Sequence, residues 1–123
     1  MKIVTVNNTP HLHTVPNESI RIEKPEVIID FDDINEQRFR LLFSPYQAIK
    51  ITTIDCFDNP LIMGVMHKVV MEVVNSDWIR ELKNTINKID STADFMDKAR
   101  HFIIPFYDDV LEIAAWDMTL KSI

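Results

Sequence analysis

Two histidines near the amino terminus have a spacing that suits a metal site. His11 and His13 are separated by one residue, so on a β-strand both rings would lie on one face and could reach the same ion. Asp30 and Asp32 share this spacing and could add carboxylate ligands, which would make the chain a metal-dependent enzyme. Because prolines flank the histidines and no spacing identifies a further ligand, we expect a surface loop with no metal and no cofactor.

The densest acidic run of the chain lies between positions 30 and 36. It consists of Asp30, Asp32, Asp33 and Glu36. Neighbouring carboxylates can perform acid–base chemistry or hold Mg²⁺ or Ca²⁺, but this run contains no glycine and lacks the spacing of an EF-hand loop. The simplest expectation is a solvated turn. The alternative is a patch that docks on a basic partner protein.

Cys56 is the only cysteine, so the chain has no internal disulfide and no cysteine-rich zinc site. A catalytic thiolate needs a base or an electropositive surrounding, whereas the neighbours of Cys56 in sequence include Asp55 and Asp58. We therefore expect a buried structural cysteine.

Three residues of the carboxyl-terminal region could line a pocket for a small ligand. His101 and Trp116 would lie opposite each other if residues 101–107 and 110–118 form a hairpin that turns at 108–109, and Tyr107 would lie beside the turn. Partial burial in ordinary packing is the alternative interpretation of His101, Tyr107 and Trp116.

Composition excludes several classes of function. The 123-residue chain has one glycine, Gly64, so it contains neither a glycine-rich phosphate-binding loop nor a GxSxG nucleophile elbow. Its net charge of -6 disfavours nucleic acid and anionic membranes as partners and favours a basic protein. The first ten residues do not have the pattern of a signal peptide, so we expect one cytoplasmic domain spanning 1–123.

The clearest element is a helix over 76–89. Ser76 is a good N-cap, and Asp77 suits the positive end of the helix dipole. Four apolar side chains then follow at helical spacing: Ile79, Leu82, Ile86 and Ile89. This apolar stripe is expected to cover one face of a sheet.

The remaining elements are mostly strands. Residues 61–74 suit a buried strand and a buried helix almost equally, and Ser44–Pro45 has turn chemistry. Apolar alternation or β-branched composition predicts strands at 2–6, 19–23, 27–31, 38–43 and 46–54, in addition to the hairpin. The fold class is therefore α+β, a mainly antiparallel sheet of about six strands with one principal helix (76–89) packed on it and a C-terminal β-hairpin.

The predicted function is a non-catalytic interaction module, an inhibitor- or immunity-like partner of a basic protein surface. Its expected contact patch combines the acidic run with Met63, Met66 and Trp78, because interfaces are rich in methionine and aromatic residues. We also expect a homodimer, since both faces of the hairpin are apolar and one helix can cover only one of them. A small-ligand-binding domain and the metal-dependent enzyme remain the alternatives.

Overall fold

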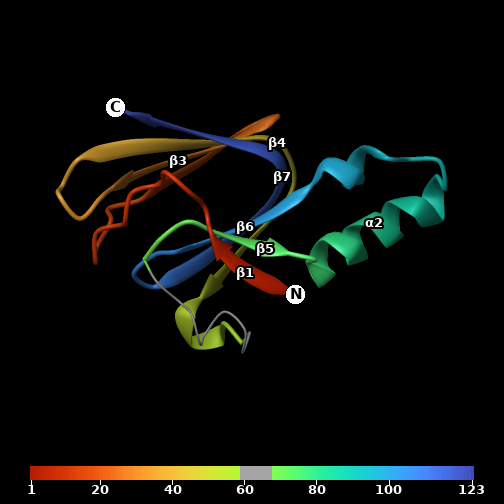
Figure 1. Cartoon of the computed structure of the whole chain (residues 1–123), viewed down its shortest axis with the longest axis horizontal. Coiled ribbons are helices and arrows are strands. Elements are labelled where there is room, and N and C mark those ends of the chain that lie inside the picture. Colours follow the sequence, from red (N-terminus) through yellow and green to blue (C-terminus); the bar gives the residue numbers. More distant parts are fainter. Residues whose placement is uncertain (59–67) are drawn as a thin grey trace.

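A computed structural model describes residues 1–58 and 68–123 and contains one seven-stranded antiparallel sheet with one α-helix (Figure 1). The strand order is β1-β5-β6-β7-β4-β3-β2. The strands are β1 (Lys2–Thr5), β2 (Ser19–Glu23), β3 (Glu26–Asp32), β4 (Arg38–Thr53), β5 (Met71–Val74), β6 (Arg100–Pro105) and β7 (Asp109–Ser122). The helix is α2 (Asp77–Ile89), and η1 (Ile54–Cys56) and η2 (Phe95–Lys98) are short 3-10 turns. This architecture confirms the α+β class.

The ambiguity over residues 61–74 is settled only in part. Residues Met71–Val74 form strand β5, which pairs with β1 and β6. Met63 and Met66 lie outside the described residues.

The two longest strands bend the sheet. β4 and β7 pair along almost their whole lengths, from Phe39 opposite Ser122 to Thr53 opposite Asp109. The predicted turn at Ser44–Pro45 is wrong, because β4 continues through it. The pairing shifts register between Tyr46 and Ala48, and such an irregularity tolerates a proline that donates no ladder hydrogen bond.

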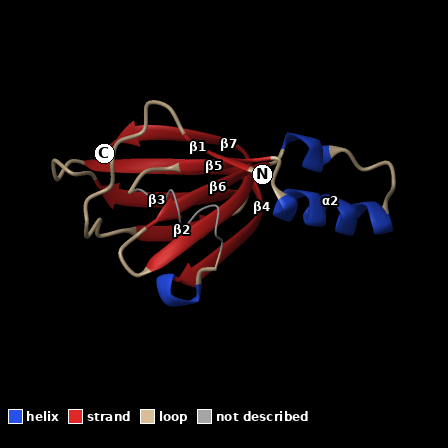
Figure 2. Ribbon diagram, turned by 60° about the horizontal axis from the view of Figure 1, so that its bottom comes forward, coloured by secondary structure: helices blue, strands red, loops and turns tan. Residues whose placement is uncertain are grey.

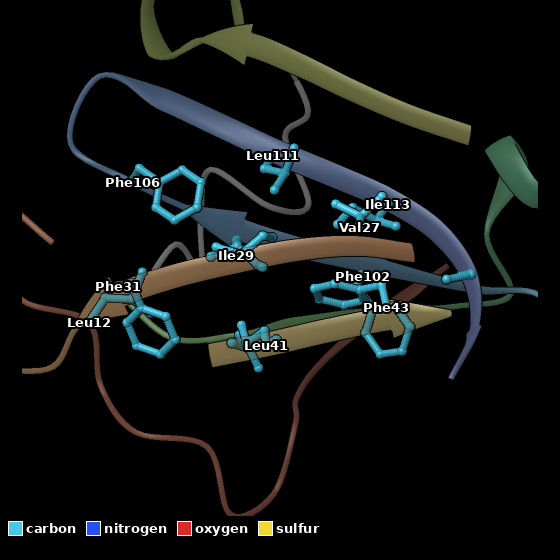
Figure 3. Close-up of a cluster of buried hydrophobic side chains, with 13 residues drawn as sticks. Leu12, Val27, Ile29, Phe31, Leu41, Phe43, Phe102, Phe106, Leu111 and Ile113 are labelled. Carbon is cyan, nitrogen blue, oxygen red and sulfur yellow. The ribbon is translucent and has the colours of Figure 1, made fainter. Parts of the chain in front are cut away.

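The bend brings the two halves of the sheet face to face around the main core (Figures 1 and 3). Phe43 on β4 and Phe102 on β6 meet edge to face, with ring centroids 5.1 Å apart. The other fully buried side chains of this core include Val27, Ile29, Phe31, Leu41, Ile104, Leu111 and Ile113. The concave face of each half of the sheet is therefore covered by the other half of the same sheet.

A second, smaller apolar cluster covers the convex face of β5, β6 and β7. Ile103 and Val110 point to this side, and Phe57, which follows η1, packs against them. Its other buried members are Val69, Met71 and Val73. Side chains alternate between the two clusters along β6 and β7, which explains why both strands are apolar on both faces.

The C-terminal hairpin is present, but its register differs by two residues from the predicted one. Pro105 pairs with Val110, and the amide of Phe106 donates to the carbonyl of Asp109 at 2.8 Å. Phe106 is buried in the main core and Tyr107 is exposed, so the turn falls at residues 107–108, one residue earlier than predicted. As a result, His101 lies opposite Ala114 rather than opposite Trp116.

Helix α2 begins as predicted and then projects beyond the sheet (Figures 1 and 2). The Ser76 hydroxyl accepts a hydrogen bond from the amide of Ile79 at 3.2 Å, which caps the first turn. The helix packs against the sheet at this end. None of its residues is fully buried, and Ile89 is 82% exposed. The apolar stripe is therefore only partly covered by the rest of the chain.

Candidate functional site

A chain of three buried polar side chains joins the base of α2 to the sheet. Ser76 Oγ lies 2.7 Å from Nδ1 of His101, and Nε2 of His101 lies 2.9 Å from Oε1 of Glu112. All three residues are less than one tenth exposed. They come from the cap of α2, from β6 and from β7, so this polar chain fixes the direction in which the helix leaves the sheet.

Lys50 and Trp78 complete the surroundings of the polar chain. Lys50 pairs with Glu112 across β4 and β7, and its Nζ lies 3.6 Å from the second carboxylate oxygen. The same ammonium lies 4.2 Å from the ring centroid of Trp78, and the rings of Trp78 and His101 meet edge to face with centroids 4.9 Å apart. Trp78 thus packs at the base of the helix and is half-buried there.

The electrostatics favour an ionised Glu112. Burial alone would raise the pKa of this carboxyl, but the hydrogen bond from His101 and the charge of Lys50 outweigh burial and lower the pKa below its ordinary value. The carboxylate therefore accepts the hydrogen carried by Nε2. When the ring is neutral, the Ser76 hydroxyl donates to Nδ1 while it accepts from Ile79.

The polar chain contains a hydroxyl, an imidazole and a carboxylate, the groups that acyl-transfer enzymes use as nucleophile, base and orienting group. Ser76, however, is only 7% exposed, and its oxygen already caps the helix. We therefore interpret Ser76, His101 and Glu112 as a structural lock that holds α2 on the sheet.

The lowered pKa of Glu112 predicts a pH-dependent contribution to stability. Ionised Glu112 stabilises the fold above the pKa it has when unfolded, and this stabilisation is lost as pH falls through its lower folded pKa. Glu112→Gln should therefore lower the free energy of unfolding by about 1.5–3 kcal/mol at pH 7, the range for a hydrogen bond to a charged group. Urea denaturation between pH 7 and pH 3 should show this difference shrinking towards the acid end. A difference that grows on acidification would contradict the assignment.

His101 also borders a hollow of about 370 Å³ between α2 and the ends of β5 and β6. Ser76, Ile79 and Arg100 line the same hollow. The other two predicted pocket residues lie elsewhere: Tyr107 is 58% exposed in the β6–β7 loop, and Trp116 lies beneath Lys98. The structure does not bring His101, Tyr107 and Trp116 together.

A second hollow of about 370 Å³ follows the apolar stripe of α2. It lies between the helix, η2 and β4, and we call residues 77–98, which carry both helical segments, the helical arm. The lining side chains are Gln47, Leu82, Thr85, Ile86, Ile89, Phe95 and Met96. Met96 is buried and Leu82 and Ile86 are half-buried, whereas Ile89 and Phe95 are exposed, so the helical arm presents an apolar surface that is open at one end.

The predicted acidic patch is largely neutralised within the chain. Asp30 accepts two hydrogen bonds from Arg40, at 2.7 and 3.0 Å, and Asp32 accepts one from Arg38 at 2.9 Å. The Arg40 hydrogen bond is the main cause that holds the pKa of Asp30 below its ordinary value. Both pairs are register partners on β3 and β4.

The rest of the acidic run closes a turn. One carboxylate oxygen of Asp33 accepts from the amides of Asn35 and Gln37, both at 2.9 Å. Glu36 is exposed at a positive φ of 61°. Among the four carboxylates of the acidic run, that of Glu36 is exposed to solvent, which agrees with the prediction of a solvated turn.

The histidine pair lies beside the acidic run, where the amide of His13 donates to the carbonyl of Asp32 and the carbonyl of His11 accepts from the amide of Ile34. Leu12 bridges to Asp33, and Nδ1 of His13 accepts from the amide of Val15 at 3.0 Å. No group of three or more potential metal ligands occurs among the described residues. Cys56, expected to be buried, is exposed instead, because η1 places it at the surface.

Other acidic side chains gather where β4 ends and β6 turns into β7. The amide of Ile54 donates to the carbonyl of Asp108, which places Asp55 in η1 near Asp108 and Asp109. Within the described ranges, no cation forms an ion pair with these three carboxylates. Figure 2 shows η1 well away from α2, so this acidic tip and the helical arm are separate surfaces.

Among residues 1–58 and 68–123, no helix is long and apolar enough to cross a membrane. Comparisons with protein-family models, with curated proteins and with solved structures gave no match to this chain.

Proposed function

We propose that this protein is a non-catalytic interaction module whose contact surface is the helical arm. One observation carries the proposal: α2 has an apolar stripe at regular helical spacing that the chain itself covers only in part, with Ile89 left 82% exposed. An amphipathic helix normally gains its stability by burying such a stripe. A partner that covers it would complete that burial.

The polar chain at the base of α2 supports this role. Ser76, His101 and Glu112 fix the helix to the sheet through two short hydrogen bonds, so the helical arm is held in position before a partner arrives. A contact surface that is ordered in advance loses less conformational entropy on binding. The lock therefore increases the affinity that a small apolar surface can provide.

The charge distribution supports a partner with a basic surface. The chain has a net charge of -6, and in the acidic tip formed by Asp55, Asp108 and Asp109 the first two are exposed and Asp109 is half-buried. Such a field accelerates encounter with a basic protein and weakens with salt. In this proposal the helical arm provides affinity, and the acidic body of the protein provides attraction at long range.

The test compares two variants that add the same charge to opposite sides of α2. Ile89→Asp places a carboxylate on the apolar stripe, whereas Asn84→Asp places one on the far side of the helix, because position 84 is two residues from both Leu82 and Ile86. Each immobilised protein is exposed to extract of its source cells, and retained proteins are compared by mass spectrometry.

The expected partner binds the parent and Asn84→Asp, is lost from Ile89→Asp, and is eluted by about 0.5 M salt, where surface charges are strongly screened. Partners that bind Ile89→Asp as well as they bind the parent would overturn the role of the helical arm. Retention that increases with salt would overturn the basic partner.

A second candidate is a small-ligand-binding domain, favoured by the hollow beside Ser76 and His101. Ala99 also lines this hollow, so Ala99→Leu should fill part of it without removing a polar contact. A panel of small carboxylic acids and phosphates would be screened by thermal denaturation. This function requires a ligand that raises the melting temperature of the parent but not of Ala99→Leu.

A further inference from the structure

We infer that the hollow at the base of α2 binds a small organic anion that carries a carboxylate or a phosphate group. This is the hollow that Ser76 and His101 border, between α2 and the ends of β5 and β6, and we call it the basal hollow. The inference rests on the second candidate function, because it takes this hollow as the ligand site. It goes further by naming the chemical class of the ligand and the side chains that recognise it.

The basal hollow gathers positive charge in a chain that is acidic overall. Among its described lining side chains three are cationic, Arg80, Lys83 and Arg100, and one is acidic, Glu72. The net charge of the whole chain is -6. The second hollow, along the apolar stripe, is lined by apolar residues together with two neutral polar ones. The local excess of cations therefore favours an oxyanion in the basal hollow.

Two of the three cations pair with carboxylates that lie outside the basal hollow. Arg80 pairs with Asp77, and Lys83 pairs with Asp97. Both aspartate side chains are more than half exposed, and neither lines the basal hollow. Because exposed ion pairs contribute little to stability, each aspartate can turn to water when a ligand takes its place.

The third cation, Arg100, is held in place and still has donors for a ligand. Its Nε and Nη2 donate to the two carboxylate oxygens of Glu72 at 3.1 and 2.7 Å. Its Cζ lies 4.7 Å from the ring centroid of Phe102, which further fixes the guanidinium. A guanidinium has more N–H groups than these bonds use, so Arg100 can donate to a further oxyanion. Glu72 thus orients the arginine without consuming its hydrogen-bonding capacity.

The rest of the lining suits a ligand with an apolar part. Val73, Ile79 and Ala99 contribute apolar surface to the basal hollow. Its volume of about 370 Å³ equals that of roughly twelve water molecules, which is enough for a ligand of about ten non-hydrogen atoms. A small aromatic or aliphatic acid, or a phosphate monoester of similar size, meets both requirements.

The first experiment titrates the isotope-labelled full chain with three probes that share a benzene ring: phenyl phosphate, benzoate and the neutral benzamide. Amide NMR spectra are recorded in about 0.1 M NaCl, where the net charge of the chain is screened beyond about 10 Å. The anions should shift the signals of Ala99 and Arg100 with dissociation constants in the millimolar range, as expected for probes of this size. Benzamide should bind at least about tenfold more weakly.

The two anionic probes distinguish the possible head groups. Stronger binding of phenyl phosphate would identify phosphate monoesters as the ligand class, and stronger binding of benzoate would identify carboxylic acids. Benzamide that binds as tightly as benzoate would overturn the anion class but leave the basal hollow as a ligand site. If none of the three probes shifts these signals at about 20 mM, the inference is overturned.

The second experiment removes charge from the lining. Arg80→Gln combined with Lys83→Gln should weaken binding of the tighter anion by about tenfold or more, because charge-assisted hydrogen bonds are lost. Arg21→Gln combined with Lys24→Gln is the matched control, since it removes one exposed arginine and one exposed lysine from the β2 region. Its affinity should stay within about twofold of that of the parent. Equal losses in the two double variants would reveal a general charge effect and overturn the site.

A third variant removes space instead of charge. Ala99→Leu fills part of the basal hollow and leaves every cation in place. It should weaken binding of both anions by about tenfold or more. Unchanged affinity would place the anions on the outer sides of Arg80 and Lys83, and would overturn the inference. None of these outcomes affects the contact surface at Ile89, which Ile89→Asp tests separately.

Discussion

The His101→Ala substitution is expected to lower the free energy of unfolding by about 3 kcal/mol or more, because it leaves two buried polar groups, one of them a carboxylate, without their hydrogen-bond partner. The imidazole is the only group that hydrogen-bonds both Ser76 and Glu112 in the described structure. Its loss leaves a carboxylate that is 5% exposed with Lys50, at 3.6 Å, as its remaining partner. Urea denaturation at pH 7 measures the effect.

His13→Ala is the matched control for this prediction. It removes the same side chain from a loop, where His13 accepts one hydrogen bond from the backbone of Val15. Its cost should stay below about 1 kcal/mol. Equal losses in the two variants would show that the buried polar chain does not lock α2 to the sheet.

The Phe102→Ala substitution is expected to have a similarly large effect, about 3–5 kcal/mol, for a different reason. Phe102 is fully buried between the two halves of the bent sheet, and its ring meets Phe43 edge to face. Removing the ring leaves a cavity at the place where the halves pack together. A lowered denaturation midpoint with an unchanged slope would measure this loss of packing.

Phe95→Ala provides the comparison within the helical arm. Phe95 is 40% exposed on η2, so its removal should cost about 1 kcal/mol or less in the monomer. If Phe95→Ala were as damaging as Phe102→Ala, the helical arm would be part of the core and not a contact surface.

The sequence predicts those parts of the fold that local chemistry decides. Alternation along 19–23 and 27–31 matches β2 and β3, and the N-cap at Ser76 matches the start of α2. Pro45 misled the prediction, because local rules make it a turn residue while the pairing with β7 keeps it within one long strand. Long-range pairing overrides local preference at this position.

The candidate site was harder to predict because it depends on the hairpin register. In the predicted register, Glu112 would lie opposite Pro105, too far along the strand to meet His101. In the structure Glu112 lies opposite Ile103, so His101 is its diagonal neighbour on the same face. The two-residue difference arises because the turn falls at residues 107–108, where Phe106 enters the main core and Tyr107 is exposed, and this burial is a tertiary effect. Ser76, 25 residues away from His101, carries no sequence signal beyond its capping role.

The acidic patch could have been interpreted more fully from the sequence. Arg38 and Arg40 have the same spacing as Asp30 and Asp32, and a hairpin between the two segments brings the four together as two cross-strand ion pairs. The acidic tip could not have been predicted from the sequence, because it brings η1 together with a loop that lies more than fifty residues later in the chain.

The central claim is that the part of the apolar stripe of α2 that the chain leaves uncovered, with Ile89 at its end, is a contact surface. The most direct test is the unfolding free energy of Ile89→Asp, measured by urea denaturation. Because Ile89 is 82% exposed, the account predicts a change of less than about 1 kcal/mol, similar to that of Asn84→Asp. A loss of about 3 kcal/mol or more would mean that the stripe is buried in the monomer, and would contradict the account.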